Sequence, residues 1–110
     1  MTETEFLAIA ESVLDAIENA FERAGEEADV DVECSRSGNV LEIEFVDNGS
    51  KIIVNTQAPM REIWVAARAG GFHYRLNDGR WLDTRDGSEL YSSLSRLAGL
   101  QAGTALDISA

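Results

Sequence analysis

The sequence has almost no cysteine or histidine, the residues that disulfide bonds, thiol chemistry and zinc-type metal sites require. Its 110 residues include one cysteine, Cys34, and one histidine, His73. A lone cysteine excludes an intrachain disulfide, and a lone histidine excludes a histidine-rich metal site. Cys34 alternates with valines, and a reactive thiol needs exposure and positive surroundings. We therefore predict that Cys34 is a structural thiol that faces the core.

Long apolar segments are also absent. No hydrophobic run approaches the ~18 residues that a membrane span needs. The N-terminal Met-Thr-Glu-Thr-Glu-Phe has neither the basic nor the apolar region of a signal peptide. A hydrophobic content of 45% argues against disorder. The simplest interpretation is one small soluble domain, residues 1–110, that is cytoplasmic and has no membrane partner.

Basic residues are scarce in the first third of the chain. Residues 1–33 contain eleven Asp or Glu and one Arg, whereas residues 34–110 contain nine acidic and eight basic residues. Nearly all of the net charge of −11 therefore lies in the first third. Nucleic acid is a disfavoured partner, because phosphates need a basic surface. Cations and basic protein surfaces are the expected partners.

The first predicted element is an amphipathic helix over residues 3–27, which Gly25 and the polar residues after it bring to an end. Apolar residues at steps of three and four form one stripe that faces a core. Carboxylates at similar steps line the opposite face, where like charges repel by about 0.2–0.5 kcal/mol a pair. The stripe contains Phe6, Ala10, Val13, Ile17, Phe21 and Ala24; the carboxylates are Glu11, Asp15, Glu18, Glu22 and Glu26.

Six strands and a second helix are predicted to follow. Alternation in residues 29–35 indicates a strand with Asp29, Asp31 and Glu33 on one face. The second helix begins after Ser88 as N-cap and ends near Gly103. Short turns make an antiparallel sheet, and both amphipathic helices must cover the same face of it. We expect an α+β fold, a two-layer α/β sandwich, whose remaining strands span residues 41–45, 51–56, 62–68, 72–77 and 80–83.

The sheet face away from the helices is predicted to be open to water, basic and aromatic. Trp64 alternates with Ile63 and Val65, so it faces water if those two face the helices. A slip in register that buries Trp64 is the alternative. His73 on the same face is either ordinary surface or a partner contact. The face carries Lys51, Ile53, Asn55, Trp64, Arg68, His73 and Arg75.

Catalytic and phosphate-binding motifs are missing. Ser, His and Asp occur without a nucleophile elbow, and no glycine-rich loop follows a strand. Residues 29–33 mimic the start of an EF-hand loop, but Cys34 and Val40 occupy the positions that need Gly and Glu. We predict that the protein is not an enzyme.

The segment Asn55–Trp64 resembles the N-x-Q-x-P-x-x-x-I-W signature of the frataxin family, in its bacterial branch. The order of elements and the acidic first helix fit that family, and so do the flanking segments Asp47–Ile53 and Gly70–Tyr74. The similarity runs from about Glu5 to Ile108.

The resemblance implies an accessory protein that regulates iron–sulfur cluster assembly and presents iron. It implies weak binding of iron (Fe²⁺ or Fe³⁺) at surface carboxylates, where other divalent cations can substitute, since oxygen donors suit hard cations. The implied partners are the cysteine desulfurase and the iron–sulfur scaffold protein. The implied metal ligands, which we call the acidic ridge, are Glu11, Asp15, Glu18, Glu22, Asp29, Asp31 and Glu33. The partner-binding candidates are Asn55, Gln57 and Trp64, with Arg68 and His73 added from the predicted open face.

Other interpretations stay open. The ridge could belong to an acidic adaptor or inhibitor that docks on a basic partner without a metal role, or it could only keep the protein in solution. Asn19 and Arg23 depart from the more acidic family members, which leaves the metal stoichiometry open. We expect a monomer, with a metal-induced oligomer as the alternative.

Overall fold

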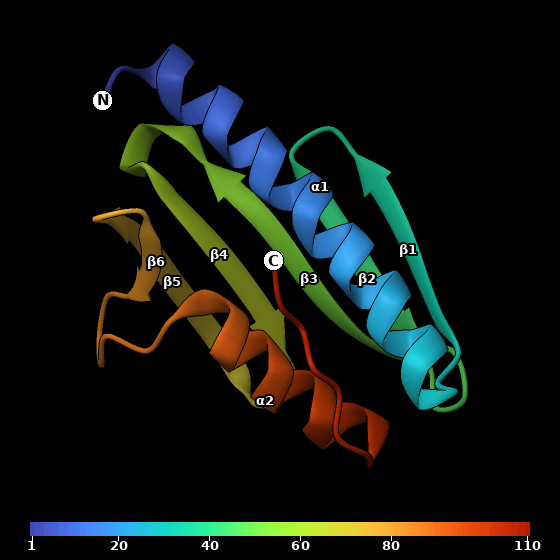
Figure 1. Cartoon of the computed structure of the whole chain (residues 1–110). Coiled ribbons are helices and arrows are strands. Elements are labelled where there is room, and N and C mark those ends of the chain that lie inside the picture. The colour runs from blue at the N-terminus through green and yellow to red at the C-terminus, as the bar shows by residue number, and fades with distance from the viewer.

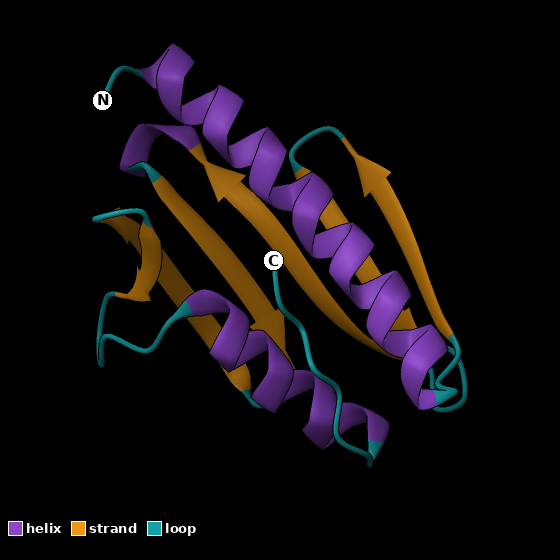
Figure 2. Cartoon of the chain, in the orientation of Figure 1, coloured by secondary structure: helices purple, strands orange, loops and turns teal.

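The computed structural model covers residues 1–110 and has two layers (Figures 1 and 2). Helices α1 (Glu3–Ala28) and α2 (Leu90–Ala102) lie on one face of a six-stranded antiparallel sheet. Its strands are ordered as in the sequence: β1 (Val32–Ser37), β2 (Val40–Phe45), β3 (Ser50–Gln57), β4 (Glu62–Ala67), β5 (Gly70–Asn77) and β6 (Arg80–Asp83). The predicted two-layer α+β sandwich is confirmed.

Helix α1 is capped at both ends by local hydrogen bonds. At its start the Thr2 hydroxyl accepts from the Glu5 N–H (3.1 Å), and the Glu5 carboxylate accepts from the Thr2 N–H (3.0 Å). At its end Asp29 adopts a left-handed conformation (φ 56°), and the Val30 N–H donates to the Gly25 carbonyl (2.8 Å). The helix therefore ends one residue later than the sequence predicts. Neither helix combines the length and apolar character that crossing a membrane requires.

The predicted boundary between α1 and β1 is wrong. Gly25 does not end the helix; it is buried within it, where a Cβ atom would lie 2.9 Å from the Val30 carbonyl oxygen and 3.2 Å from Val32 Cγ2. The glycine instead lets the chain pass closely over the last turn. Asp29 and Asp31 belong to this connection, so only the last of the three predicted strand carboxylates lies in β1.

The core lies between the helices and the sheet and forms one cluster of 22 buried residues. In α1, Leu14 and Ala20 join the predicted stripe, whereas Val13 is only partly buried. Trp81, which the sequence pattern left unassigned, is 5% exposed, and its ring meets that of Phe6 edge-on with centroids 6.1 Å apart. The N-terminal part of α1 is thereby attached to the β6 edge of the sheet.

Helix α2 begins one residue later than predicted. Its N-cap is Glu89 rather than Ser88, because the Glu89 carboxylate accepts from the N–H groups of Tyr91 (2.8 Å) and Ser92 (3.1 Å). The Ser88 N–H is instead bound by the Asp86 carboxylate (2.9 Å). The predicted C-terminal stop at Gly103 is confirmed, with φ 73°.

The C-terminal segment runs between the two helices (Figure 1). Leu106 and Ile108 are buried there as part of the core. The Ser95 hydroxyl accepts from the Ile108 N–H (2.9 Å) and donates to the Ile108 carbonyl (3.2 Å). Arg23 Nη2 of α1 donates to the Ser109 carbonyl (2.8 Å). The segment thus fastens α1 to α2 without forming a helix or strand itself.

Candidate functional site

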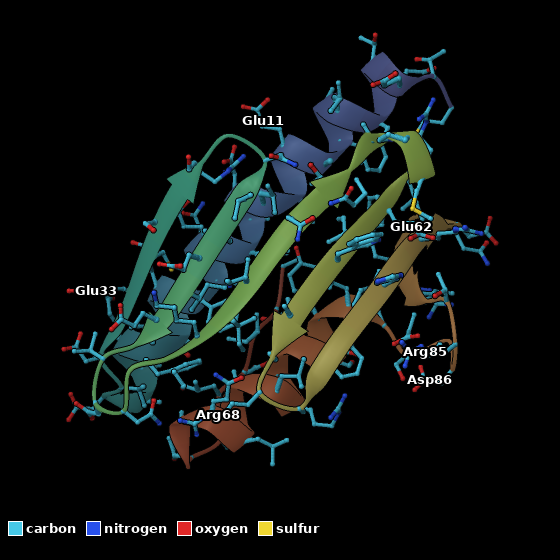
Figure 3. All side chains as sticks on the ribbon, turned by 180° about the vertical axis from the view of Figure 1, so that it is seen from behind. Glu11, Glu33, Glu62, Arg68, Arg85 and Asp86 are labelled. Carbon is cyan, nitrogen blue, oxygen red and sulfur yellow. The ribbon has the colours of Figure 1, made fainter.

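The acidic ridge is exposed along almost its whole length. Of its seven carboxylates only that of Glu18 belongs to a half-buried residue. Figure 3 labels two members, Glu11 on α1 and Glu33 on β1, and both point outward. No three His, Cys, Asp or Glu side chains lie close enough together to hold a metal ion. The ridge is therefore a row of separate oxygen donors and not a preformed chelating site.

Carboxylates gather around a hollow at the C-terminal end of α1. This open concavity of about 570 Å³ lies between α1, the connection to β1 and the turn from β2 to β3. We call its five acidic lining residues the acidic hollow: Glu22, Glu26, Asp29, Asp31 and Asp47. Helical periodicity placed Glu26 on this face. Asp47 carries no such signal in the sequence, because only the fold brings its turn to the end of the helix.

One ridge carboxylate already has a cationic partner. Arg36 Nη1, from β1, lies 2.6 Å from Asp15 Oδ1, and Arg36 Nε donates to the Gly38 carbonyl (3.1 Å). The side chain of Arg36 is 22% exposed and that of Asp15 is 63% exposed. A cation that binds at Asp15 must therefore share its carboxylate with Arg36 or displace the guanidinium. Sequence spacing does not reveal this pair, because its members lie on separate elements.

On the open sheet face, the cross-strand neighbours Trp64 and His73 stack. Their ring centroids lie 4.2 Å apart and their planes differ by 5°. Ile63 and Val65 are buried, so the predicted register of β4 is correct. Trp64 is half-buried, however, and not largely exposed as the alternation alone suggested. The stacked histidine covers one face of the indole.

A buried glutamate holds this pair in place. Glu62 has a side chain that is only 3% exposed, although it lies on the open face (Figure 3). Its Oε1 accepts from Trp64 Nε1 (2.8 Å), and its Oε2 accepts from Arg75 Nε (2.7 Å). His73 Nδ1 lies 3.7 Å from Oε1. We call Glu62, Trp64, His73 and Arg75 the sheet-face cluster. The prediction of a basic face overlooked Glu62, although it is in phase with Trp64.

Two of the other partner-binding candidates adjoin this cluster and one does not. Asn55 pairs across the sheet with Trp64, and Gln57 Nε2 donates to Asn55 Oδ1 (2.6 Å). Arg68 lies in the turn between β4 and β5, at the end of the sheet opposite Glu62 (Figure 3). The structure therefore brings Asn55, Gln57, Trp64 and His73 together and leaves Arg68 apart.

Comparison with known proteins places the chain in a family. The family model described as the frataxin-like domain matches residues 1–104. The iron-sulfur cluster assembly protein CyaY of Janthinobacterium sp. (strain Marseille) is 59% identical over 103 residues, which are 94% of this chain and 92% of that protein. The chain belongs to the frataxin-like family.

Solved structures agree with this assignment. The frataxin of Psychromonas ingrahamii matches this frataxin-like chain with a TM-score of 0.82 and 32% identity, covering 100% of both chains. A trimeric frataxin from Saccharomyces cerevisiae, described as complexed with ferrous, matches with a TM-score of 0.73 and 25% identity, covering 86% of each chain. The predicted membership of the frataxin family is confirmed.

The single cysteine of this frataxin-like chain lies beside the ridge. Cys34 is half-buried in β1 and packs against the core. Burial raises the pKa of its thiol to about 12, with further contributions from the negative charges of Glu22 and Glu18. The group is therefore a protonated thiol near neutral pH. This agrees with the predicted structural role and leaves carboxylates as the only strong donors of the ridge.

Proposed function

We propose that this frataxin-like protein is an accessory factor of iron–sulfur cluster assembly that regulates the process and presents iron. The observation that carries the proposal is the identity of 59%, over nearly the whole chain, with a protein named for iron–sulfur cluster assembly. Its partners in this proposal are the cysteine desulfurase and the scaffold protein. The chain itself supplies two distinct surfaces for them, the acidic ridge and the sheet-face cluster.

The acidic ridge is proposed to bind iron weakly. Oxygen donors suit Fe²⁺ and other hard divalent cations, and a yeast relative has been described as complexed with ferrous. Because no three donors converge, the protein can offer an ion only one or two carboxylates at a time, and water must complete its coordination. Such binding is weak, exchangeable and poorly selective, which suits an ion that is handed on.

The two surfaces are proposed to meet different partners. The ridge and the acidic hollow carry most of the excess negative charge, so they attract a basic rim on the desulfurase. The sheet-face cluster, with Asn55 and Gln57 beside it, offers a rigid aromatic group of the kind enriched at binding hot spots. We propose that this face seats the scaffold, with Arg68 at its margin.

Anaerobic titration with Fe²⁺, followed by amide NMR, tests the metal role. We expect broadening or shifts at Glu11, Asp15, Glu18, Glu22, Asp29, Asp31 and Glu33, with no change in α2. The hollow further predicts effects at Glu26 and Asp47. Mn²⁺ or Co²⁺ should perturb the same residues, because open carboxylate sites select poorly. Perturbation confined to His73 or Cys34 would refute the ridge as the iron site.

A second candidate is an acidic adaptor or inhibitor that docks on a basic partner and carries no metal. The separation of the carboxylates favours it, since no chelating group of three is present. The same titration separates the two functions. An adaptor would show only shifts that rise without saturation and vanish in high salt, because screening weakens general attraction between charges.

The oligomeric state forms a separate part of the proposal. A yeast relative is described as a trimer. We propose that this chain is a monomer without metal and that iron drives any larger assembly. Light scattering after size-exclusion chromatography, with and without Fe²⁺, checks this directly. A trimer in metal-free buffer would contradict it.

A further inference from the structure

Glu62 is unusual because it is a buried carboxylate on the face that is otherwise open to solvent. A buried charge is unfavourable unless it is paired and hydrogen-bonded. Here both oxygens are engaged, one by Trp64 Nε1 at 2.8 Å and one by Arg75 Nε at 2.7 Å. The Arg75 side chain is 63% exposed and so lies over the carboxylate from the solvent side. The proposed docking role of Trp64 does not by itself account for this arrangement.

The contacts of Glu62 restrict how Trp64 can be used. The hydrogen bond to Nε1 fixes the rotation of the indole, and the parallel stack with His73 at 4.2 Å fixes its tilt. The bond also occupies the only hydrogen-bonding group of the side chain, since an indole has one donor and no acceptor. The part of Trp64 that stays free for a partner consists of ring carbon atoms.

We propose that Glu62 is a positioning residue that holds Trp64 in its binding orientation. A partner then meets the indole through its ring carbons and does not accept a hydrogen bond from Nε1. The partner must accordingly meet Trp64 with an apolar side chain or with a cation over the ring, and not with a hydrogen-bond acceptor. This inference rests on the proposed function, in which the scaffold docks on the sheet-face cluster.

A preordered side chain favours binding because the partner does not have to immobilise it. Ordering one flexible side chain on association weakens affinity by roughly three- to tenfold. Loss of the acceptor at position 62 should therefore weaken binding by about this factor, without removing any atom that touches the partner. The effect must act through Trp64, and this distinguishes a positioning role from a general structural one.

Two substitutions of Glu62 by side chains of nearly equal size distinguish the effect of the hydrogen bond on binding from the effect of packing. Glu62→Met keeps the length of the side chain and removes the strong acceptor, whereas Glu62→Gln keeps an amide oxygen that can accept from Nε1. Affinity for the scaffold is measured by calorimetry for both variants, for Trp64→Ala and for Trp64→Ala combined with Glu62→Met. We expect roughly three- to tenfold weaker binding for Met and a change below about twofold for Gln. The double variant should match Trp64→Ala alone.

The outcomes distinguish the two levels of the proposal. If Trp64→Ala does not weaken binding, the proposed docking face is wrong. If Trp64→Ala weakens binding but Glu62→Met does not, or if the effect of Met persists in the absence of Trp64, the positioning role is wrong.

The unmodified protein provides a second measurement that needs no variant to fold. The indole N–H signal of Trp64 in the NMR spectrum should keep its position and its slow hydrogen exchange when the scaffold binds, because its bond to Glu62 persists. If the signal shifts by a large amount and stays shifted when this protein is saturated with scaffold, the N–H donates to the partner instead of to Glu62. That result would overturn the inference.

Discussion

At the scale of single residues, contacts across the fold decide chemistry that residue type leaves open. Cys34 is the only thiol, but half-burial beside Glu18 and Glu22 keeps it protonated. Glu62 resembles any surface glutamate in the sequence, yet it is 3% exposed and holds Trp64. In both cases the neighbours across the fold, and not the residue itself, set the behaviour of the side chain.

Cys34 should react slowly with alkylating reagents in the folded protein. Its pKa is raised to about 12, so the thiolate fraction near pH 8.5 is far below that of an unfolded chain. We expect iodoacetamide to modify the native protein at least on the order of a hundredfold more slowly than the urea-unfolded protein. Because the folded pKa lies above the unfolded one, stability should fall as pH rises from about 9 toward 12. Similar alkylation rates for the native and the unfolded protein would show that neither burial nor the acidic neighbours suppress the thiolate.

Trp64→Ala should weaken scaffold binding at a modest cost in stability. The substitution removes a stack with His73 and a hydrogen bond to a carboxylate, so we expect a loss of about 1–2 kcal/mol in the free energy of unfolding. Urea denaturation measures this loss, and Trp81→Ala is the matched core control. Truncation of the buried Trp81 should cost about 3–5 kcal/mol. Equal losses for the two variants would mean that Trp64 belongs to the core.

At the scale of elements, helix α1 combines a buried apolar stripe with carboxylates that repel one another. Arg36 relieves the repulsion at Asp15 only, because it reaches no other ridge carboxylate. The next carboxylates along the helix, Glu18, Glu22 and Glu26, have no such partner among the ion pairs of the protein. Mutual repulsion of these carboxylates therefore lowers the stability of the helix. Such a cost is expected where residues are retained for binding.

Neutralising the unpaired ridge carboxylates should stabilise the protein. Glu18→Gln combined with Glu22→Gln removes charge from three consecutive pairs, so we expect a gain of about 0.5–1.5 kcal/mol at low salt that shrinks at high salt. Asp15→Asn is the matched control; it loses the contact with Arg36 and should give no gain. Urea denaturation at two salt concentrations measures the change in the free energy of unfolding for the double variant and for the control. A double variant that is less stable than the parent would mean that these charges make favourable contacts.

Periodicity predicted both helices, all six strands and the buried faces of every element but β6, because those features depend on residues close in sequence. It failed where distant segments meet. The late start of β1 follows from the close approach of the chain to Gly25, and the pairing of Asp15 with Arg36 and the place of Asp47 in the hollow depend on the fold. Glu62 was missed for a related reason: alternation shows which face a side chain occupies, but not how deeply its neighbours bury it.

At the scale of the whole molecule, the C-terminal segment fastens the two helices over the sheet. Leu106 and Ile108 point into the core, while Asp107 between them is exposed. Hydrogen bonds from Arg23 and Ser95 hold the same stretch of backbone. The segment lies on the helical side of the sheet (Figure 1), whereas Glu62 of the sheet-face cluster lies on the opposite face (Figure 3). Changes in it should alter stability without altering the docking surface.

Truncating the two buried side chains tests whether the C-terminal segment contributes to stability and not to docking. Leu106→Ala combined with Ile108→Ala should lower the free energy of unfolding by at least about 3 kcal/mol, because each buried aliphatic contributes about 2–5 kcal/mol. Asp107→Ala is the matched exposed control and should change it by less than about 0.5 kcal/mol. Affinity for the scaffold, measured well below the melting temperature, should stay unchanged in both variants. A loss of affinity without unfolding would connect the segment to docking.

The rate of cluster assembly on the scaffold is the most direct measurement of the proposed function. Desulfurase, scaffold, cysteine and Fe²⁺ are combined anaerobically, and the absorbance of the growing cluster is followed with and without this protein. We expect the wild-type protein to change the initial rate at saturation. Two variants should each reduce that change. Trp64→Ala weakens docking on the scaffold, and the double variant Glu18→Gln, Glu22→Gln removes two carboxylates of the acidic ridge. An initial rate that is the same with and without saturating wild-type protein would refute the proposed role in cluster assembly.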